Sequence, residues 1–447
     1  MTLDFLWEVF REIADGEAIA GGAEPCSFSD LLARVSAKRE LATRAGIQRG
    51  AVVTLESDYS ESSIALLLAL VDLGTIVVPI APTSAARAVE LRAIAQAEWR
   101  VDVPQAGDAR IQSLGGRADH PLYSRLRADS HPGLVLFSSG YTGPPKGAVH
   151  DWSRLLTKYK KRRHRLRTLL FLLFDHIGGI DTLLQALSNG STVVLPRDRT
   201  PEGVAATIER HGVEVLPAAP SFLTMLLLSE AHRRYDLSSL RYITYGAEVM
   251  PAATLERLAA AFPGVRLLQK YGLTELGTLR SHSRANDSLW VKVGGEGYET
   301  RVVDGLLQIK AASSMLGYLN APSPLTEDGW FMTGDAVEVE GEYLRILGRA
   351  SDLINVGGRK VYPAAVEAVI HEVDNIAEAV VFGERHAFTG QIVVARVALR
   401  VPEDPLSVER RIRSHCASRL ESYQVPIRVD VAPAEALHTD RQKMSRR

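Results

Sequence analysis

The chain has 447 residues, enough for two or three domains with a large buried core. Its net charge of −1 gives no electrostatic case for binding nucleic acid or an anionic membrane surface. Its two cysteines, Cys26 and Cys416, lie far apart, so no disulfide framework is indicated and a reducing cytoplasm is the expected compartment.

The N-terminal residues lack the basic segment and apolar stretch of a signal peptide. The longest apolar stretch, residues 64–80, is interrupted by Asp72 and Gly74. It therefore predicts a buried helix followed by a strand, and not a membrane span.

Helix and strand patterns alternate through the first two thirds of the chain. Predicted helices cover residues 60–73, 201–211, 221–231 and 252–262, and predicted strands cover 75–79, 192–195, 213–216 and 242–245. Alternation of this kind predicts parallel sheets with helices on both faces.

From about residue 292 the pattern changes to short strands separated by turns that contain glycine. The predicted strands are 300–303, 307–309 and 343–347, which indicates a small antiparallel unit. After a boundary at 348–351 come helix 363–372, strands 379–382 and 392–399, and helix 406–420. We expect an α/β protein with a large domain of parallel sheets and a small antiparallel β unit, residues 1–348, and a small α+β domain, residues 349–447.

The segment 136–149, LFSSGYTGPPKGAV, has the composition of a loop that binds phosphate. Glycines let backbone N–H groups approach an anion, hydroxyl groups add donors, and a lysine adds a cation. The GxxxxGK(S/T) spacing of a P-loop is absent. A simple turn after the apolar strand 133–137 is the alternative interpretation.

This loop resembles the signature loop of the adenylate-forming superfamily, which contains acyl-CoA synthetases, peptide-synthetase adenylation domains and luciferases. Four more segments match that family in its order, and a last lysine, Lys443, lies near the C-terminus. The segments are YGLTE at 271–275, GYLN at 317–320, WFMTGD at 330–335 and GRASDLINVGGRKVYPAAVE at 348–367. The resemblance covers essentially the whole chain, and motifs in a fixed order are more specific than any one of them.

The resemblance implies an AMP-forming acid–thiol ligase. Such an enzyme uses ATP and Mg²⁺ to convert a carboxylic acid into an acyl or aryl adenylate with release of pyrophosphate, and then transfers the acyl group to a thiol, here most readily CoA. It also implies that the C-terminal domain rotates between the two half-reactions. Two alternatives are a stand-alone adenylation enzyme that loads an acid or amino acid onto a carrier protein, and a catalytically weak protein that binds an acid or a nucleotide.

The resemblance also implies roles for individual residues around the nucleotide. The loop residues would bind the β and γ phosphates, and they are Ser138, Ser139, Gly140, Thr142, Gly143 and Lys146. Tyr271 would pack against adenine, Gly272 belongs to the same nucleotide-binding motif, and Gly246, Ala247 and Glu248 resemble the family's segment on the adenine side. Thr274 would contact the α-phosphate, and Glu275 would help bind Mg²⁺, a hard cation that prefers oxygen ligands.

Six further residues would act on the ribose, the acid and the thiol. By resemblance, Asp335 would accept both ribose hydroxyl groups, and Arg349 would complement it. Lys443 would neutralise charge between the attacking carboxylate and the α-phosphate, and His176 would line the acyl pocket. Gly357 and Gly358 would border the pantetheine tunnel during thioester formation. The alternatives are surface turns for Asp335 and Arg349, and a frayed basic tail for Lys443.

Several features depart from the family's pattern or leave two interpretations open. Tyr141 replaces the usual Ser or Thr of the loop, and Gln442 replaces a glycine before the last lysine. Asp175 either begins a helix or pairs with the ammonium group of an amino-acid substrate. The basic run 158–167, KYKKRRHRLR, is either a solvated helix face or a surface that attracts an acidic carrier protein or the phosphates of CoA.

Overall fold

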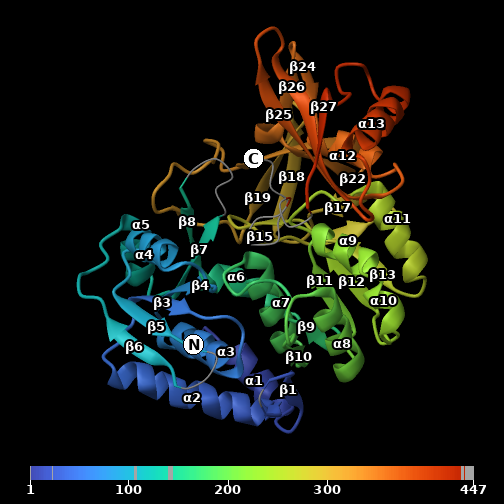
Figure 1. The fold of residues 1–447 in the computed structure, drawn as a ribbon. Helices are drawn as coiled ribbons and strands as arrows, with labels where there is room; N and C mark the ends of the chain where they lie inside the picture. Colours follow the sequence, from blue (N-terminus) through green and yellow to red (C-terminus); the bar gives the residue numbers. More distant parts are fainter. Residues whose placement is uncertain (1, 23, 105–107, 139–143, 434–436, 438–447) are drawn as a thin grey trace.

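The computed structural model of the chain describes residues 2–22, 24–104, 108–138, 144–433 and 437. Figure 1 shows a large body of sheets and helices, with a smaller unit of C-terminal residues above it. Among the described residues, no helix is both long and apolar enough to cross a membrane.

A seven-stranded sheet with the order β20-β8-β7-β4-β3-β5-β6 forms one side of the body. Its strands β3, β4, β5 and β7 are parallel, whereas β6, β8 and β20 pair antiparallel at the two edges. The strands are β3 (Val52–Glu56), β4 (Ile76–Ile80), β5 (Trp99–Asp102), β6 (Arg110–Ser113), β7 (Gly133–Ser138), β8 (Lys146–Asp151) and β20 (Gly317–Tyr318). The helices α2 (Phe28–Arg44), α3 (Glu61–Leu73), α4 (Ala85–Ile94) and α5 (Pro121–Ala128) accompany this sheet.

The predicted helix and strand of the long apolar stretch are confirmed in this sheet. Helix α3 begins after Ser60, whose side chain accepts a hydrogen bond from the Ser63 N–H, and it ends at Gly74 in the left-handed conformation. Its residues from Ser63 to Val71 are all buried because it packs between α2 and the sheet. The apolar character of α3 on every side is therefore explained by its burial in the core of the body.

A second seven-stranded sheet has the order β13-β12-β11-β9-β10-β1-β2 and is parallel except for β2. Its strands are β1 (Glu17–Ala20), β2 (Cys26–Ser27), β9 (Thr168–Leu169), β10 (Val193–Val194), β11 (Val215–Ala218), β12 (Tyr242–Tyr245) and β13 (Arg266–Gln269). The helices near it are α1 (Asp4–Glu12), α6 (Trp152–Leu155), α7 (Ile177–Ser188), α8 (Pro201–His211), α9 (Pro220–Leu228), α10 (Ala231–Arg234) and α11 (Ala252–Ala261). The predicted parallel sheets with flanking helices are therefore confirmed.

The predicted helix 221–231 is interrupted in the structure. It ends as α9 at Leu228, and α10 follows after Glu230, which has a φ of 55°. A left-handed residue breaks the run of helical hydrogen bonds, so the chain changes direction there.

The predicted antiparallel unit is a six-stranded sheet with the order β16-β17-β22-β21-β19-β18. Its strands are β16 (Ser281–Ser283), β17 (Trp290–Val293), β18 (Tyr298–Val303), β19 (Leu306–Ala311), β21 (Phe331–Glu340) and β22 (Tyr343–Arg349). A short hairpin, β14 (Gly272–Leu273) and β15 (Gly277–Thr278), joins it to the body.

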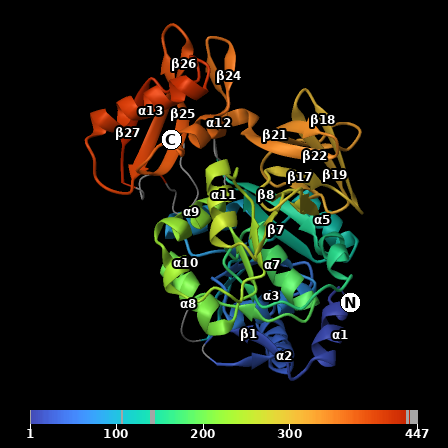
Figure 2. The same cartoon turned by 90° about the vertical axis from the view of Figure 1, so that its right-hand side faces the viewer.

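The residues after β22 form a unit with its own hydrophobic core. Its strands are β23 (Ile354–Val356), β24 (Arg359–Val361), β25 (Ile376–His386), β26 (Gly390–Leu399) and β27 (Arg428–Val431), and its helices are α12 (Pro363–Ile370) and α13 (Pro405–Arg419). The core includes Ile354, Val366, Ile412 and Cys416, all buried. Figures 1 and 2 both place this unit above α11, with α12 next to the antiparallel sheet.

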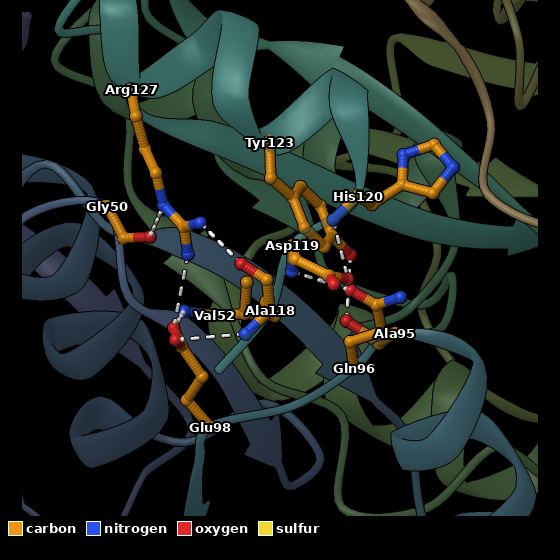
Figure 3. A network of polar contacts seen from close by, with 10 residues as sticks. All are labelled: Gly50, Val52, Ala95, Gln96, Glu98, Ala118, Asp119, His120, Tyr123 and Arg127. Carbon is orange, nitrogen blue, oxygen red and sulfur yellow. Dashed lines mark hydrogen bonds and ion pairs between the residues drawn. The ribbon is translucent and has the colours of Figure 1, made fainter. Parts of the chain in front are cut away.

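A polar network fastens α5 to the first sheet (Figure 3). The Glu98 carboxylate accepts hydrogen bonds from the backbone N–H groups of Val52, at 2.7 Å, and Ala118, at 3.1 Å. Arg127 donates to the Gly50 carbonyl at 3.0 Å and lies 3.4 Å from Glu98. One carboxylate thus satisfies donors from a strand, a loop and a helix.

Replacement of Glu98 by alanine is expected to destabilise the folded state by about 1–3 kcal/mol, because it leaves buried donors without an acceptor. The control is Glu40→Ala, which breaks an ion pair with Arg44 whose side chains are 69% and 79% exposed. That control should change stability little. Thermal unfolding of both variants measures the difference, and equal shifts in the melting temperature would contradict the role given to Glu98.

Candidate active site

A cavity of about 700 Å³ lies where the two parallel sheets, the antiparallel sheet and the C-terminal unit meet. The ends of β7 and β8, the first turns of α7 and α9, the β14–β15 hairpin, β21, β22 and α12 all contribute to its walls. Most of the segments singled out in the sequence therefore border one space.

The base of the predicted phosphate loop is well defined. Ser138 and Lys146 face each other as the last pair of the β7–β8 hairpin, and both line the cavity. The Asn320 side chain donates to the Pro145 carbonyl at 2.8 Å and accepts from the Gly147 N–H at 3.1 Å. The GYLN segment thus holds the loop's base. Five residues of the loop lie outside the described residues, namely Ser139, Gly140, Tyr141, Thr142 and Gly143.

Tyr271, Asp335 and Arg349 come from three separate motifs and form one group, joined by a hydrogen bond and an ion pair. The Tyr271 hydroxyl donates to Oδ2 of Asp335, and Nε of Arg349 lies 2.8 Å from Oδ1. Burial and the Asp335 carboxylate raise the pKa of Tyr271 well above its ordinary value, so its hydroxyl stays a donor. The structure thus excludes the interpretation of Asp335 and Arg349 as unrelated surface turns.

Thr274 and Glu275 lie on the turn of the β14–β15 hairpin. Nε2 of the buried His150 donates to the Thr274 carbonyl at 2.7 Å and so fixes the turn. The Glu275 carboxylate accepts a hydrogen bond from the Tyr318 hydroxyl, and the Tyr318 ring lies 5.6 Å from the Lys146 ammonium group. Within the described ranges, no group of three or more His, Cys, Asp or Glu residues is placed to hold a metal ion.

The segment after β12 approaches the next chain segment closely. A Cβ atom at Gly246 would lie 2.4 Å from the Lys270 carbonyl oxygen, so only glycine fits there. Ala247 has a φ of 70°, and Glu248 accepts from the Ser221 N–H at 3.1 Å. The other carboxylate oxygen of Glu248 is buried and receives no hydrogen bond from any described residue. The site therefore holds an acceptor that a bound donor would satisfy.

His176 lines the cavity and occupies the N-cap of α7, where its Nδ1 accepts from the Gly178 N–H at 3.1 Å. The N-cap of α7 is therefore His176, and Asp175 lies one residue before it. Asp175 itself is buried.

The predicted glycine pair of the pantetheine tunnel is not brought to the cavity in this structure. Gly357 and Gly358 are exposed at the turn between β23 and β24, with φ of 60° and 85°. The C-terminal unit instead lines the cavity with Tyr362, Pro363 and other residues of α12. Lys443 lies outside the described residues.

The basic run 158–167 is not a helix face, because only its first two residues lie in a helical turn. Lys158 and Tyr159 end a 3₁₀ turn (Leu156–Tyr159), and residues 160–167 have no regular structure. Arg162 donates to Glu12 at 2.5 Å, and Arg167 donates to Glu17 at 2.7 Å. Those two arginines are thus paired within the chain.

The sequence analysis missed a group of charged residues behind the cavity. Lys158 donates to Oδ1 of Asp181 on α7 and to the Thr278 carbonyl, the latter at 2.8 Å. Lys270, the residue after β13, lines the cavity and interacts electrostatically with Asp181 and Lys158. The only sequence signal was the position of Lys270 directly before the YGLTE motif.

Acid is expected to destabilise the protein through His150. Burial lowers the pKa of His150 to about 4, and the backbone carbonyls of Thr274 and Ser313 only partly oppose this. The unfolded chain binds the proton near pH 6.5, so stability falls as the pH drops from about 6.5 to about 4, by about 3 kcal/mol for this group.

His150→Gln should flatten this part of the pH dependence of thermal unfolding. The control is His164→Gln, at an exposed position of the basic run, which should retain the wild-type slope. The buried His371, whose pKa is also lowered to about 4 by burial, keeps some slope in the His150 variant. A slope unchanged in His150→Gln would contradict the assignment.

Comparisons with known proteins agree with this geometry. The model of the AMP-binding enzyme family matches residues 97–309, and that of the AMP-binding enzyme C-terminal domain matches residues 365–441. An indoleacetate–CoA ligase of Aromatoleum aromaticum is 30% identical over 68% of this chain and 65% of its own length. A long-chain-fatty-acid–CoA ligase of Mycobacterium tuberculosis is 27% identical over 91% of this chain and 89% of its own length.

The chain covers 63%, 65% and 60% of the length of three relatives that are 32%, 30% and 29% identical to it, which is less than two thirds of each. Among solved structures, an anthranilate CoA ligase in complex with anthranoyl-AMP superposes with a TM-score of 0.83 at 20% identity, over 100% of this chain and 95% of that one. This likeness shows the shared fold.

Proposed function

Because this chain belongs to the adenylate-forming superfamily of AMP-binding enzymes, we propose that it is an AMP-forming acid–thiol ligase. It would convert a carboxylic acid and ATP into an acyl or aryl adenylate and pyrophosphate, and then pass the acyl group to CoA. The observation that carries the proposal is the meeting of motif residues from four distant segments around one cavity, Lys146, Thr274, Asp335 and Arg349.

A thiol cannot readily displace an oxygen from a carboxylate, because oxide and hydroxide are poor leaving groups. The acid must therefore be activated first. One carboxylate oxygen attacks the α-phosphorus, and pyrophosphate departs. Negative charge develops around the phosphorus, so preorganised donors and cations there lower the barrier. Lys146 and Ser138 would bind the departing phosphates, Thr274 the α-phosphate, and Lys443 the charge between the two reacting groups.

The nucleotide would be held by the group of Tyr271, Asp335 and Arg349. An ionised carboxylate offers about four lone pairs, and Tyr271 and Arg349 use two of those on Asp335. The remaining ones are suited to the vicinal hydroxyls of a ribose. The free oxygen of Glu248 is suited to an N–H donor such as the amino group of adenine.

Glu275 is the residue that would help hold Mg²⁺, since its carboxylate faces the cavity on the same turn as Thr274. The absence of a three-residue metal cluster among the described residues fits an ion that takes most ligands from phosphates and water. The ion would supply positive charge to the phosphates. Glu275 itself is oriented by Tyr318.

We place the boundary between the ATP-binding domain and the mobile C-terminal domain at residues 348 and 349. The turn with Gly357 and Gly358 faces away from the cavity in this arrangement, so it would have to swing inward for thioester formation. CoA is the preferred acceptor because the related enzymes are named CoA ligases. A carrier protein is the alternative acceptor.

The test is turnover with ATP, Mg²⁺, CoA and a panel of fatty, aromatic, dicarboxylic and amino acids. We expect AMP, pyrophosphate and an acyl-CoA in equal amounts for at least one acid, measured by mass spectrometry. Pyrophosphate and AMP without acyl-CoA, rescued by a carrier protein, would favour carrier loading. Binding of ATP or acid without pyrophosphate release would favour the catalytically weak binding protein.

A further inference from the structure

The wall of the cavity formed by α7 and the end of β13 carries an unbalanced positive charge. Lys158, Asp181 and Lys270 meet there, and two of the three are cations. Lys158 and Asp181 form an ion pair in which each side chain is 21% exposed. Asp181 lies on α7, whose N-cap residue His176 would line the acyl pocket, and both His176 and Lys270 line the cavity. This charge therefore lies on the side of the cavity where the acid would bind.

Asp181 is already engaged by neighbours other than Lys270. Lys158 donates to its Oδ1, and the Tyr159 hydroxyl donates to the same oxygen at 2.6 Å. Lys158 has a second acceptor in the Thr278 carbonyl at 2.8 Å. The positive charge of Lys158 and the negative charge of Asp181 therefore neutralise each other within this ion pair.

Lys270 is left as the surplus cation. Its backbone N–H donates to the Tyr245 carbonyl at 2.7 Å, but its ammonium group forms no hydrogen bond or ion pair with any described residue, although Lys270 lines the cavity. Burial lowers the pKa of Lys270, and Arg163 and Lys158 add to the effect, while Asp181 opposes it. Lys270 is half-buried. An ammonium group that is partly removed from water and has no partner carries a desolvation cost, and a bound anion would offset that cost.

We propose that Lys270 recognises a second carboxylate on the substrate, so that the preferred acid of this chain is a dicarboxylic acid. This rests on the proposed function, since the first carboxylate is the one that would be adenylated. Lys270 would form a charge-assisted hydrogen bond with the second carboxylate at the far end of the acid. An unsubstituted fatty chain would instead bury apolar surface against an unpaired ammonium group.

The test compares each diacid with its monoamide, which has nearly the same shape but one charge less. Suitable pairs are glutarate with glutaramate, and isophthalate with 3-carbamoylbenzoate. Wild type should prefer the diacid in kcat/KM. In Lys270→Met the ratio of diacid to monoamide should fall by about 10–100-fold, the size expected for one hydrogen bond between charged groups. Lys270→Arg should retain most of the preference.

The matched control is Lys292→Met, at a lysine whose side chain is 47% exposed and pairs with Glu342 on the antiparallel sheet. It should leave the ratio unchanged. Lys270→Gln is the second variant if the methionine variant has a lowered melting temperature. Diacid and monoamide losses of equal size would overturn the proposal, because Lys270 would then act on the reacting carboxylate or on the fold.

Binding of glutarate without ATP, measured by calorimetry, separates this proposal from the proposed function. Glutarate should bind wild type at least tenfold more tightly than Lys270→Met, even if no acid is turned over. Equal affinities of the two proteins would overturn the diacid assignment while leaving acid activation in place. Turnover of monoacids with no preference for any diacid would also overturn the diacid assignment while leaving acid activation in place.

Discussion

Lys443→Ala is expected to slow adenylate formation by about 10²–10³-fold or more, the loss typical of removing one preorganised charge-stabilising group. The reason is that an ammonium group between the carboxylate and the α-phosphate offsets charge that develops only during that step. Thioester formation from a presynthesised adenylate should be much less affected. Pyrophosphate release measures the first half-reaction, and release of AMP from the adenylate measures the second.

Arg446→Ala is the matched control, because it removes one positive charge from the same C-terminal segment. Its activity should remain close to that of wild type. If both variants lose the same small fraction of activity, the segment is a basic tail without a catalytic lysine. If Lys443→Ala slows both half-reactions equally, its role is not confined to adenylation.

Gly358→Trp is expected to abolish thioester formation and spare adenylate formation. In the described arrangement a Cβ at residue 358 has no neighbour within 4 Å, so an indole there fits while the turn is exposed. Once the turn swings to the site, the same indole would fill the path of the pantetheine arm. The measurement is the rate of each half-reaction in the variant.

The backbone at Gly358 requires its own control. Its φ of 85° is unfavourable for any side chain, so strain alone would weaken the turn in the tryptophan variant. Gly358→Ala introduces the same strain without the bulk, and it should form the thioester at close to the wild-type rate. Full thioester formation by Gly358→Trp would show that the turn does not enter the path of the thiol.

Local sequence signals predicted many elements because the signals lie within the elements themselves. Helix α8 has the predicted bounds, with Thr200 as its cap, Pro201 in its first turn and Gly212 in the left-handed conformation at its end. Strand β12 also has the predicted bounds. In contrast, β1 joins the second sheet beside β10, about 170 residues away, and no local pattern encodes such a pairing.

The same distinction applies to the residues of the candidate site. Residues that belong to motifs could be identified from the sequence, whereas residues related only through packing could not. The motif residues Tyr271, Asp335 and Arg349 were identified from resemblance, and the structure adds that Tyr271 and Arg349 both contact the Asp335 carboxylate. Lys270 and Asp181 were missed because neither belongs to a motif. Their relation depends on the packing of α7 against the β14–β15 hairpin, which brings together residues far apart in sequence. Charge balance inside a cavity becomes visible only in three dimensions.

The central claim is that a substrate carboxylate attacks the α-phosphorus of ATP, and oxygen labelling tests it directly. An accepted acid labelled with ¹⁸O in its carboxylate is turned over with ATP and CoA, and the products are analysed by mass spectrometry. We predict one ¹⁸O atom in AMP and none in pyrophosphate, because the attacking oxygen stays on the α-phosphorus when the thiol displaces AMP. Label in inorganic phosphate with formation of ADP, or AMP without label, would contradict the account.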